Sequence, residues 1–258
     1  MDALRITSKG TRATLVIDRA ERRNALTQEM WEVLPDLVQE ALTFPGVRVL
    51  VLTSAVSGVF SAGADVVEYR QNAGNVEWGL KSQDRVARAL KALRDAPVPT
   101  IAAVDGPCIG GGFGLAMACD FRLVTDRATF GVPSAKLGMI FPFGDIVELI
   151  SLIGPAATRR VLFTGQTLDA QWAFWSGFAD EIQTPELLMD AVDRWTGALH
   201  LASPQAVRAT KRMIRSVTDG RRLPTSETDQ FVTQALQSSD HLEGVAAFLE
   251  RRSPSFKT

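Results

Sequence analysis

The stretch CIGGGFGLAMACD (108–120) places three adjacent glycines between an apolar run and a predicted helix of small residues. The run VPTIAAV (98–104) before it and the run DFRLVTD (120–126) after it have the β-branched and apolar content of strands. Glycines at such a junction carry no side chain, so a ligand or another segment of backbone can come close. The stretch therefore predicts a strand–turn–helix–strand unit of an α/β protein.

Three kinds of site compete for the glycines between residues 106 and 114. A dinucleotide-binding fingerprint requires a third glycine where its two alignments place Met117 or Leu115. A phosphate-binding loop requires Lys and then Ser or Thr where this chain has Gly112 and Phe113. Two interpretations remain: a helix N-terminus whose free N–H groups face a ligand oxygen, and close packing of the helix on a strand.

Strands and helices alternate through most of the chain, which is typical of an α/β core. Further strands are expected at ATLVID (13–18), at VRVLVLT (47–53) and around 179–183. Apolar residues at helical spacing predict a helix after Thr27, which is its expected N-cap. Pro35 lies inside that helix and is expected to kink or interrupt it.

The second half of the chain is mainly helical. Residues 54–75 have no clear period and are expected to form a loop, and a helix is expected over 76–96. From Asp145 onward most of the chain shows helical patterns, and after about residue 195 only helices are expected. We therefore expect one continuous unit with a core at 1–195 and a C-terminal helical oligomerisation segment at 196–258.

Composition limits the classes of function. The 258 residues carry a formal net charge of −1, which gives no sign of a nucleic-acid-binding face. No secretory signal pattern is visible, and no apolar run approaches the ~20 residues of a membrane span. Cys108 and Cys119 have apolar neighbours and are expected to be buried thiols of a cytoplasmic protein. His200 and His241 are far apart and no metal-ligand spacing occurs, so no metal is expected.

A second stretch favours the ligand interpretation of the glycines. In VFSAGADVVEY (59–69), the small residues 61–64 again follow a strand and a turn. Two such turns can each direct one backbone N–H at the same point. Two N–H groups that converge on one oxygen form an oxyanion hole.

Five stretches occur in the order and spacing of a known family: ERRNALT (21–27), FSAGADV (60–66), VDGPCIGGGFGLAMACDFRLV (104–124), FGVPSAKLGMI (130–140) and EGVAAFLERRSPSF (243–256). In them the chain resembles the crotonase superfamily, also called the enoyl-CoA hydratase/isomerase family. The resemblance covers nearly the whole length. It implies an α/β fold built as a crotonase-like spiral of β-β-α turns with a C-terminal helical segment, and assembly into trimers or dimers of trimers.

The resemblance also implies a site for an acyl-CoA thioester. The thioester oxygen would accept hydrogen bonds from the N–H groups of Ala64 and Gly111, which would stabilise an enolate. Coenzyme A, as part of the substrate rather than a cofactor, would lie along two segments: Arg22, Arg23 and Ala25 in one, and Ala62, Asp65 and Val66 in the other. Arg22 and Arg23 either pair with phosphate oxygens or are solvated loop charges.

The chain departs from the hydratases of this family at their two glutamates. The matching positions are Gly114 and Ser134, so hydratase activity is expected to be weak or absent. A carboxylate that some isomerases of the family use is also missing, because Pro142 stands at that position. Asp145 and Glu148 remain as candidate acid–base groups, although Asp145 as an N-cap with Glu148 three residues on also fits a capping box.

The expected function is therefore acyl-CoA binding in fatty-acyl or related CoA-thioester metabolism, by an enzyme of the lyase or isomerase class. Two alternatives stay open. One is an acyl-CoA-binding protein without turnover, and the other is an isomerase, decarboxylase or hydrolase that uses another carboxylate.

Overall fold

The computed structural model describes residues 3–256. The strands are β1 (Leu4–Lys9), β2 (Arg12–Ile17), β3 (Val49–Ser54), β4 (Thr100–Val104), β5 (Pro107–Ile109), β6 (Phe121–Thr125), β7 (Thr129–Gly131), β8 (Leu168–Asp169) and β9 (Glu181–Gln183). The helices are α1 (Gln28–Leu42), α2 (Val66–Gln71), α3 (Val76–Arg94), α4 (Gly111–Met117), α5 (Phe143–Thr164), α6 (Ala170–Trp175), α7 (Leu188–His200), α8 (Pro204–Thr218), α9 (Ser226–Leu236) and α10 (Ser239–Glu250). Three short 3₁₀ helices are η1 (Ala20–Arg22), η2 (Pro133–Leu137) and η3 (Pro185–Leu187).

Six strands form the main sheet in the order β1-β2-β3-β4-β6-β9. The β1–β2 pair is an antiparallel hairpin and the other pairs are parallel, so the predicted alternation of strands and helices is confirmed. A smaller sheet has the order β5-β7-β8. The chain therefore leaves the main sheet at β4, enters the small sheet at β5, and returns through α4 to β6.

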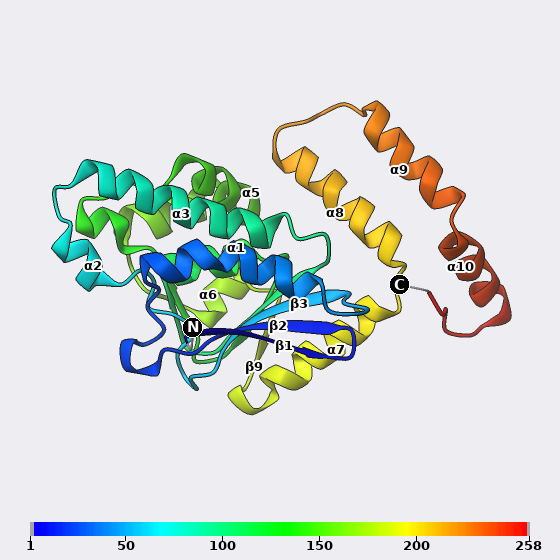
Figure 1. Ribbon diagram of the computed structural model, residues 1–258, viewed down its shortest axis with the longest axis horizontal. Helices are drawn as coiled ribbons and strands as arrows, with labels where there is room; N and C mark the ends of the chain where they lie inside the picture. The colour runs from blue at the N-terminus through cyan, green and yellow to red at the C-terminus, as the bar shows by residue number, and fades with distance from the viewer. Residues whose placement is uncertain (1–2, 257–258) are drawn as a thin grey trace.

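Successive residues of the central strands face opposite sides of the main sheet, as the period of two requires. One side packs against α7 and holds Val49, Val51, Ile101, Ala103 and Leu123 together with Leu188, Ala191 and Val192. The other side joins the large core beneath α1 and α3, which Figure 1 shows as two neighbouring helices above the sheet. Helix α1 lies over the strands there and also contacts α3.

Helix α1 corrects one expectation and confirms another. Thr27 is its N-cap, because the Thr27 Oγ1 accepts a hydrogen bond of 3.2 Å from the Met30 amide. Pro35 does not interrupt the helix, which continues to Leu42. Leu34 and Val38 are fully buried beside Pro35, so packing holds the helix together although the proline supplies no amide hydrogen bond.

Three other local expectations were incomplete. Residues 54–75 were expected to form a loop, but α2 forms within them after Asp65, whose carboxylate accepts from the Val67 amide. The first strand β1 was not foreseen, because its burial alternates only weakly along an edge of the sheet. Helix α5 begins at Phe143, with Pro142 as its N-cap residue, and not after Asp145.

The last three helices extend from the core as an arm, which lies to the right in Figure 1 and comprises α8, α9 and α10. The expected boundary at residues 195–196 falls inside α7, which packs on the main sheet. Helix α8 is tied to the core by Lys211, whose Nζ donates to Asp120 Oδ2 at 2.6 Å and to the Val98 carbonyl at 2.9 Å. Helix α9 contributes no buried residue.

Candidate functional site

The two glycine-containing stretches lie side by side. Ser61 forms a parallel bridge with Cys108, and the Ile109 amide donates to the Ser61 carbonyl at 2.9 Å. The amides of Phe60 and Ser61 both donate to the Pro107 carbonyl. The segment that follows β3 therefore runs along β5, and the two segments lie side by side at the start of α4.

The segment before α1 holds the same region from the other side. Leu26 forms a parallel bridge with Ala64: the Leu26 amide donates to the Gly63 carbonyl at 2.7 Å, and the Asp65 amide donates to the Leu26 carbonyl at 2.9 Å. The Ala62 amide donates to the Arg23 carbonyl at 3.0 Å. These bonds use the groups on either side of Ala64 and leave its own amide unused.

The amides of Ala64 and Gly111 are neighbours. Gly111 is the first residue of α4, so its N–H has no partner within the helix. A Cβ built at Gly111 would lie 3.5 Å from the Ala64 nitrogen, and a Cβ at Gly63 would lie 3.0 Å from the Gly111 nitrogen. Gly63 also has φ of +94° and no room beside the Ile109 carbonyl, so only glycine suits this position.

Gly114 and Ser134 differ in how much room they offer. Gly114 is buried in α4, where a built Cβ would lie 3.2 Å from Leu90 Cδ1. The Leu90 side chain of α3 therefore limits the space for a larger residue at position 114. Ser134 is half-buried in η2. The contact with Leu90 was not foreseen, because the spacing of apolar residues shows which helix face is buried but not what it meets.

The two segments expected along coenzyme A are adjacent, since Ala62 is hydrogen-bonded to Arg23. Arg22, Arg23, Ala62 and Val66 are exposed and Ala25 is half-buried. Asp65 differs, because its side chain is buried and accepts a hydrogen bond of 2.7 Å from Arg19.

Burial alone would raise the pKa of Asp65. The hydrogen bonds from Arg19 and the Val67 amide outweigh that effect, so the pKa lies below its usual value. The carboxylate is therefore ionised and engaged within the protein, where it caps α2 and pairs with Arg19. The Asp65 side chain is therefore not free to bind a ligand, and its amide is also used within the protein, in the hydrogen bond to the Leu26 carbonyl.

The capping-box interpretation of Asp145 and Glu148 is wrong. Asp145 lies in the first turn of α5, is buried, and pairs with Arg94 of α3 at 3.4 Å. Glu148 pairs with Arg94 at 3.2 Å and also with Arg215 of α8. The two carboxylates therefore belong to an ion-pair group that joins α3, α5 and α8.

Burial raises the pKa of Asp145, and the attraction of Arg94 only partly opposes this effect. The ionised carboxylate therefore destabilises the folded state at neutral pH. This cost disappears as the pH falls through the raised folded-state pKa toward the unfolded value of about 4. We expect Asp145→Asn to have a Tm at or above that of the wild type at pH 7, with the difference shrinking toward pH 4.

Thermal unfolding between pH 4 and pH 7 measures this difference. Asp84→Asn, an exposed carboxylate paired with Arg88 on α3, controls for the loss of one negative charge. A clear drop in Tm for Asp145→Asn at pH 7 would show that the ion pair with Arg94 is net stabilising.

Burial also limits what the two thiols can do. It raises the pKa of Cys119 to about 12, and it raises the pKa of Cys108 well above its usual value. Neither thiol is therefore a ready nucleophile. Within residues 3–256, no group of three or more His, Cys, Asp or Glu side chains is arranged to hold a metal ion. No helix in the same range is long and apolar enough to cross a membrane.

The architecture and the paired stretches define a class: an α/β protein of the crotonase fold with helices at its C-terminal end. The structure superposes on an enoyl-CoA hydratase/isomerase family protein from Hyphomonas neptunium with a TM-score of 0.94 at 36% identity, covering 99% of this chain and 97% of that one. The sequence model of the family described as Enoyl-CoA hydratase/isomerase matches residues 8–258. The chain belongs to the enoyl-CoA hydratase/isomerase family, which confirms the resemblance in its motifs.

Curated relatives of the chain include a Crotonyl-CoA hydratase from Syntrophomonas wolfei subsp. wolfei. It is 34% identical over 249 residues, which cover 95% of this chain and 94% of the relative. A Carnitinyl-CoA dehydratase from Proteus mirabilis is 30% identical over 261 residues, which cover 99% of this chain and 98% of the relative. The chain is thus similar along its whole length to acyl-CoA hydratases and dehydratases.

Proposed function

We propose that this chain binds acyl-CoA thioesters through the backbone amides of Ala64 and Gly111. The observation that carries the proposal is the closeness of these two amides, neither of which donates to any other group in residues 3–256. Both residues are half-buried, so a ligand oxygen can reach amides that are partly shielded from water. Negative charge that develops on a thioester oxygen would be stabilised there by about 3–4 kcal/mol per donor.

The proposed chemistry proceeds through the thioester enolate without the two-glutamate pair of the hydratases. Gly114 and Ser134 stand at the positions that the resemblance assigns to those glutamates. General acids and bases each contribute about 10²–10⁴-fold, so hydration of an enoyl-CoA is expected to be slow. Asp145 and Glu148 remain the alternative acid–base groups, although both are engaged by Arg94.

Calorimetry with three ligands of one acyl chain tests the binding proposal. Butyryl-CoA has the thioester carbonyl, S-butyl-CoA is the thioether without it, and butyrate lacks coenzyme A. We expect the order butyryl-CoA, S-butyl-CoA, butyrate from tightest to weakest, because butyryl-CoA uses both the amides and the coenzyme A contacts, the thioether keeps only the coenzyme A contacts, and butyrate lacks these contacts. Equal affinity for the thioester and the thioether would exclude the proposed role of the amides.

A product screen over enoyl-, hydroxyacyl- and branched acyl-CoAs separates an enzyme from a binding protein. A new product supports an isomerase, decarboxylase or hydrolase, and binding without any product supports the non-catalytic alternative. If a reaction is found, Asp145→Asn lowers turnover by about 10²-fold or more only where Asp145 is a general acid or base.

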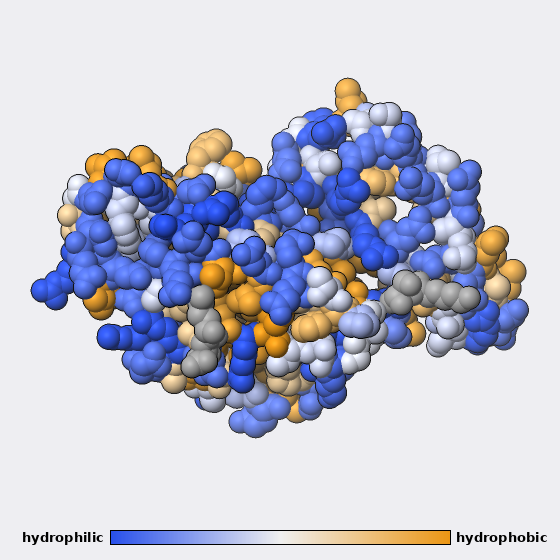
Figure 2. Space-filling view, viewed as in Figure 1, coloured by the Kyte–Doolittle hydropathy of each residue, from blue (hydrophilic) through white to orange (hydrophobic). Residues whose placement is uncertain are grey.

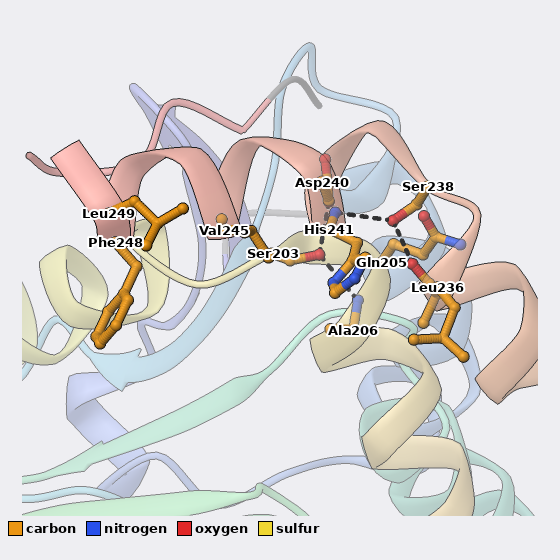
Figure 3. Close-up of a pocket in the computed structure, with 12 residues that line it drawn as sticks. Ser203, Gln205, Ala206, Leu236, Ser238, Asp240, His241, Val245, Phe248 and Leu249 are labelled. Carbon is orange, nitrogen blue, oxygen red and sulfur yellow. Dashed lines mark hydrogen bonds between the residues drawn. The ribbon is translucent and has the colours of Figure 1, made fainter.

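The proposal includes a homotrimer or a dimer of trimers, which the apolar surface of the arm supports. On α10, Leu242, Phe248 and Leu249 are 69%, 84% and 74% exposed, and Figure 2 shows hydrophobic residues at this edge of the molecule. A hollow of about 420 Å³ lies between α8, α9 and α10. Val245 and Phe248 are among the residues that line it, and Figure 3 labels both. Monomers rarely expose such a surface. Sedimentation should give three or six chains, and a monomer would contradict the proposal.

The proposed setting is fatty-acyl or related CoA-thioester metabolism in the cytoplasm. The two buried free thiols suit a reducing compartment.

A further inference from the structure

Helix α1 and the segment just before it contact both halves of the proposed thioester site. Two residues before the helix, Leu26 holds the Ala64 segment through two main-chain hydrogen bonds. One turn into the helix, the fully buried Trp31 lies against Gly111: a Cβ built there would be 2.7 Å from Trp31 Cζ2 and 3.2 Å from Cη2. The same Cβ position is 3.5 Å from the Ala64 nitrogen. The benzene edge of the indole thus lies against Gly111, the residue that carries one of the two amides.

The indole is held in place by packing alone. Its Nε1 is buried and has no hydrogen-bond partner in residues 3–256. Buried indole N–H groups usually find a partner, and leaving one without a partner is unfavourable. The apolar surface that the ring buries offsets this cost. The feature that the ring contacts there is the backbone of Gly111.

We propose that Trp31 is a positioning residue that sets the spacing of the Ala64 and Gly111 amides; this inference rests on the proposed thioester site. Leu26 holds the Ala64 segment by hydrogen bonds and Trp31 holds Gly111 by contact. Leu26 and Trp31 lie five positions apart in one segment of the chain. Without the ring, the start of α4 can move toward α1 and the amides move out of register. The ring also keeps water from the side of Gly111 that faces α1.

The test compares thioester preference, defined as the ratio of affinities for butyryl-CoA and S-butyl-CoA, in three variants. Trp31→Leu should lower this preference about 10-fold, which is the size of one good hydrogen bond. Its affinity for the thioether should stay close to that of the wild type. Trp31→Phe has a smaller ring and loses no hydrogen bond, so its thioester preference should fall measurably but less than that of Trp31→Leu.

Trp195→Leu is the matched control. Trp195 packs on Phe121 and donates to Glu181, on the α7 side of the main sheet. Its loss should lower Tm without changing thioester preference. If Trp31→Leu does not fold, Trp31→Phe decides the question, because a folded ring variant should still show a measurable part of the loss.

Each remaining outcome overturns a specific statement. An unchanged preference in the Trp31 variants, or equal losses for both ligands, means that Trp31 only supports the fold, and the inference fails. A wild-type protein without thioester preference removes the proposed site itself, and the inference falls with it.

Discussion

Ala64→Pro is expected to lower turnover of any acyl-CoA that the protein accepts by about 10²–10³-fold, the usual cost of one lost oxyanion donor. Proline replaces the amide hydrogen by a ring carbon, which also points toward the proposed oxygen position. It breaks no main-chain hydrogen bond of the fold, because the bridge with Leu26 is made by Gly63 and Asp65. The preceding Gly63 tolerates the restriction that proline imposes on its neighbour. Thioester affinity in the ground state should fall less, by about 10-fold.

Ala64→Gly is the control, since it keeps the amide and removes only the methyl group. It should behave like the wild type in thioester preference. A folded Ala64→Pro protein that retains full turnover and full preference would show that the oxygen binds elsewhere. If no substrate is found, the preference alone serves as the readout.

Gly114→Glu with Ser134→Glu and Leu90→Ala is expected to raise hydration of crotonyl-CoA by about 10²–10⁴-fold over the wild type. The third substitution is included because a Cβ at 114 would lie only 3.2 Å from Leu90 Cδ1, so the leucine side chain limits the space for a glutamate. Removing the leucine side chain makes room for the glutamate, at a cost of about 2–5 kcal/mol in stability. The variant should therefore be assayed well below its own Tm.

Gln at positions 114 and 134, in the same Leu90→Ala background, is the matched control. It has the same size as the glutamate variant and no acid or base, so it should hydrate no faster than the wild type. Equal rates for the Gln and Glu variants would exclude acid–base catalysis from these positions. A wild type that already hydrates crotonyl-CoA rapidly would show that its acid and base lie elsewhere.

The fold was largely predictable because its signals are local. Strands β2, β3, β4, β6 and β9 fall within or close to the predicted ranges, since each is a short apolar run with a clear boundary. The paired stretches were predictable because small residues at two strand ends are unusual. The family resemblance then named the two amides, which the structure places side by side.

The parts that could not be predicted depend on contacts between distant segments. Asp145 fits a cap by its neighbours in sequence, but Arg94 is 51 residues away and engages it. Leu90 and Trp31 are ordinary members of apolar helix faces, and only their contacts with Gly114 and Gly111 relate them to the proposed site. Pro35 is tolerated because buried neighbours stabilise α1, which a local rule for proline does not include.

The arm has a consequence for local stability. Helix α9 has no buried residue, α8 has only Pro204, and α10 has only Asp240 and Ala247. Segments with so few buried contacts open without unfolding the rest, so their amide hydrogens exchange with solvent early. Association through α10 would bury these helices and slow that exchange, while the amides of the main sheet would change little. Hydrogen–deuterium exchange in the arm, followed against protein concentration, therefore reports subunit assembly separately from the stability of the core.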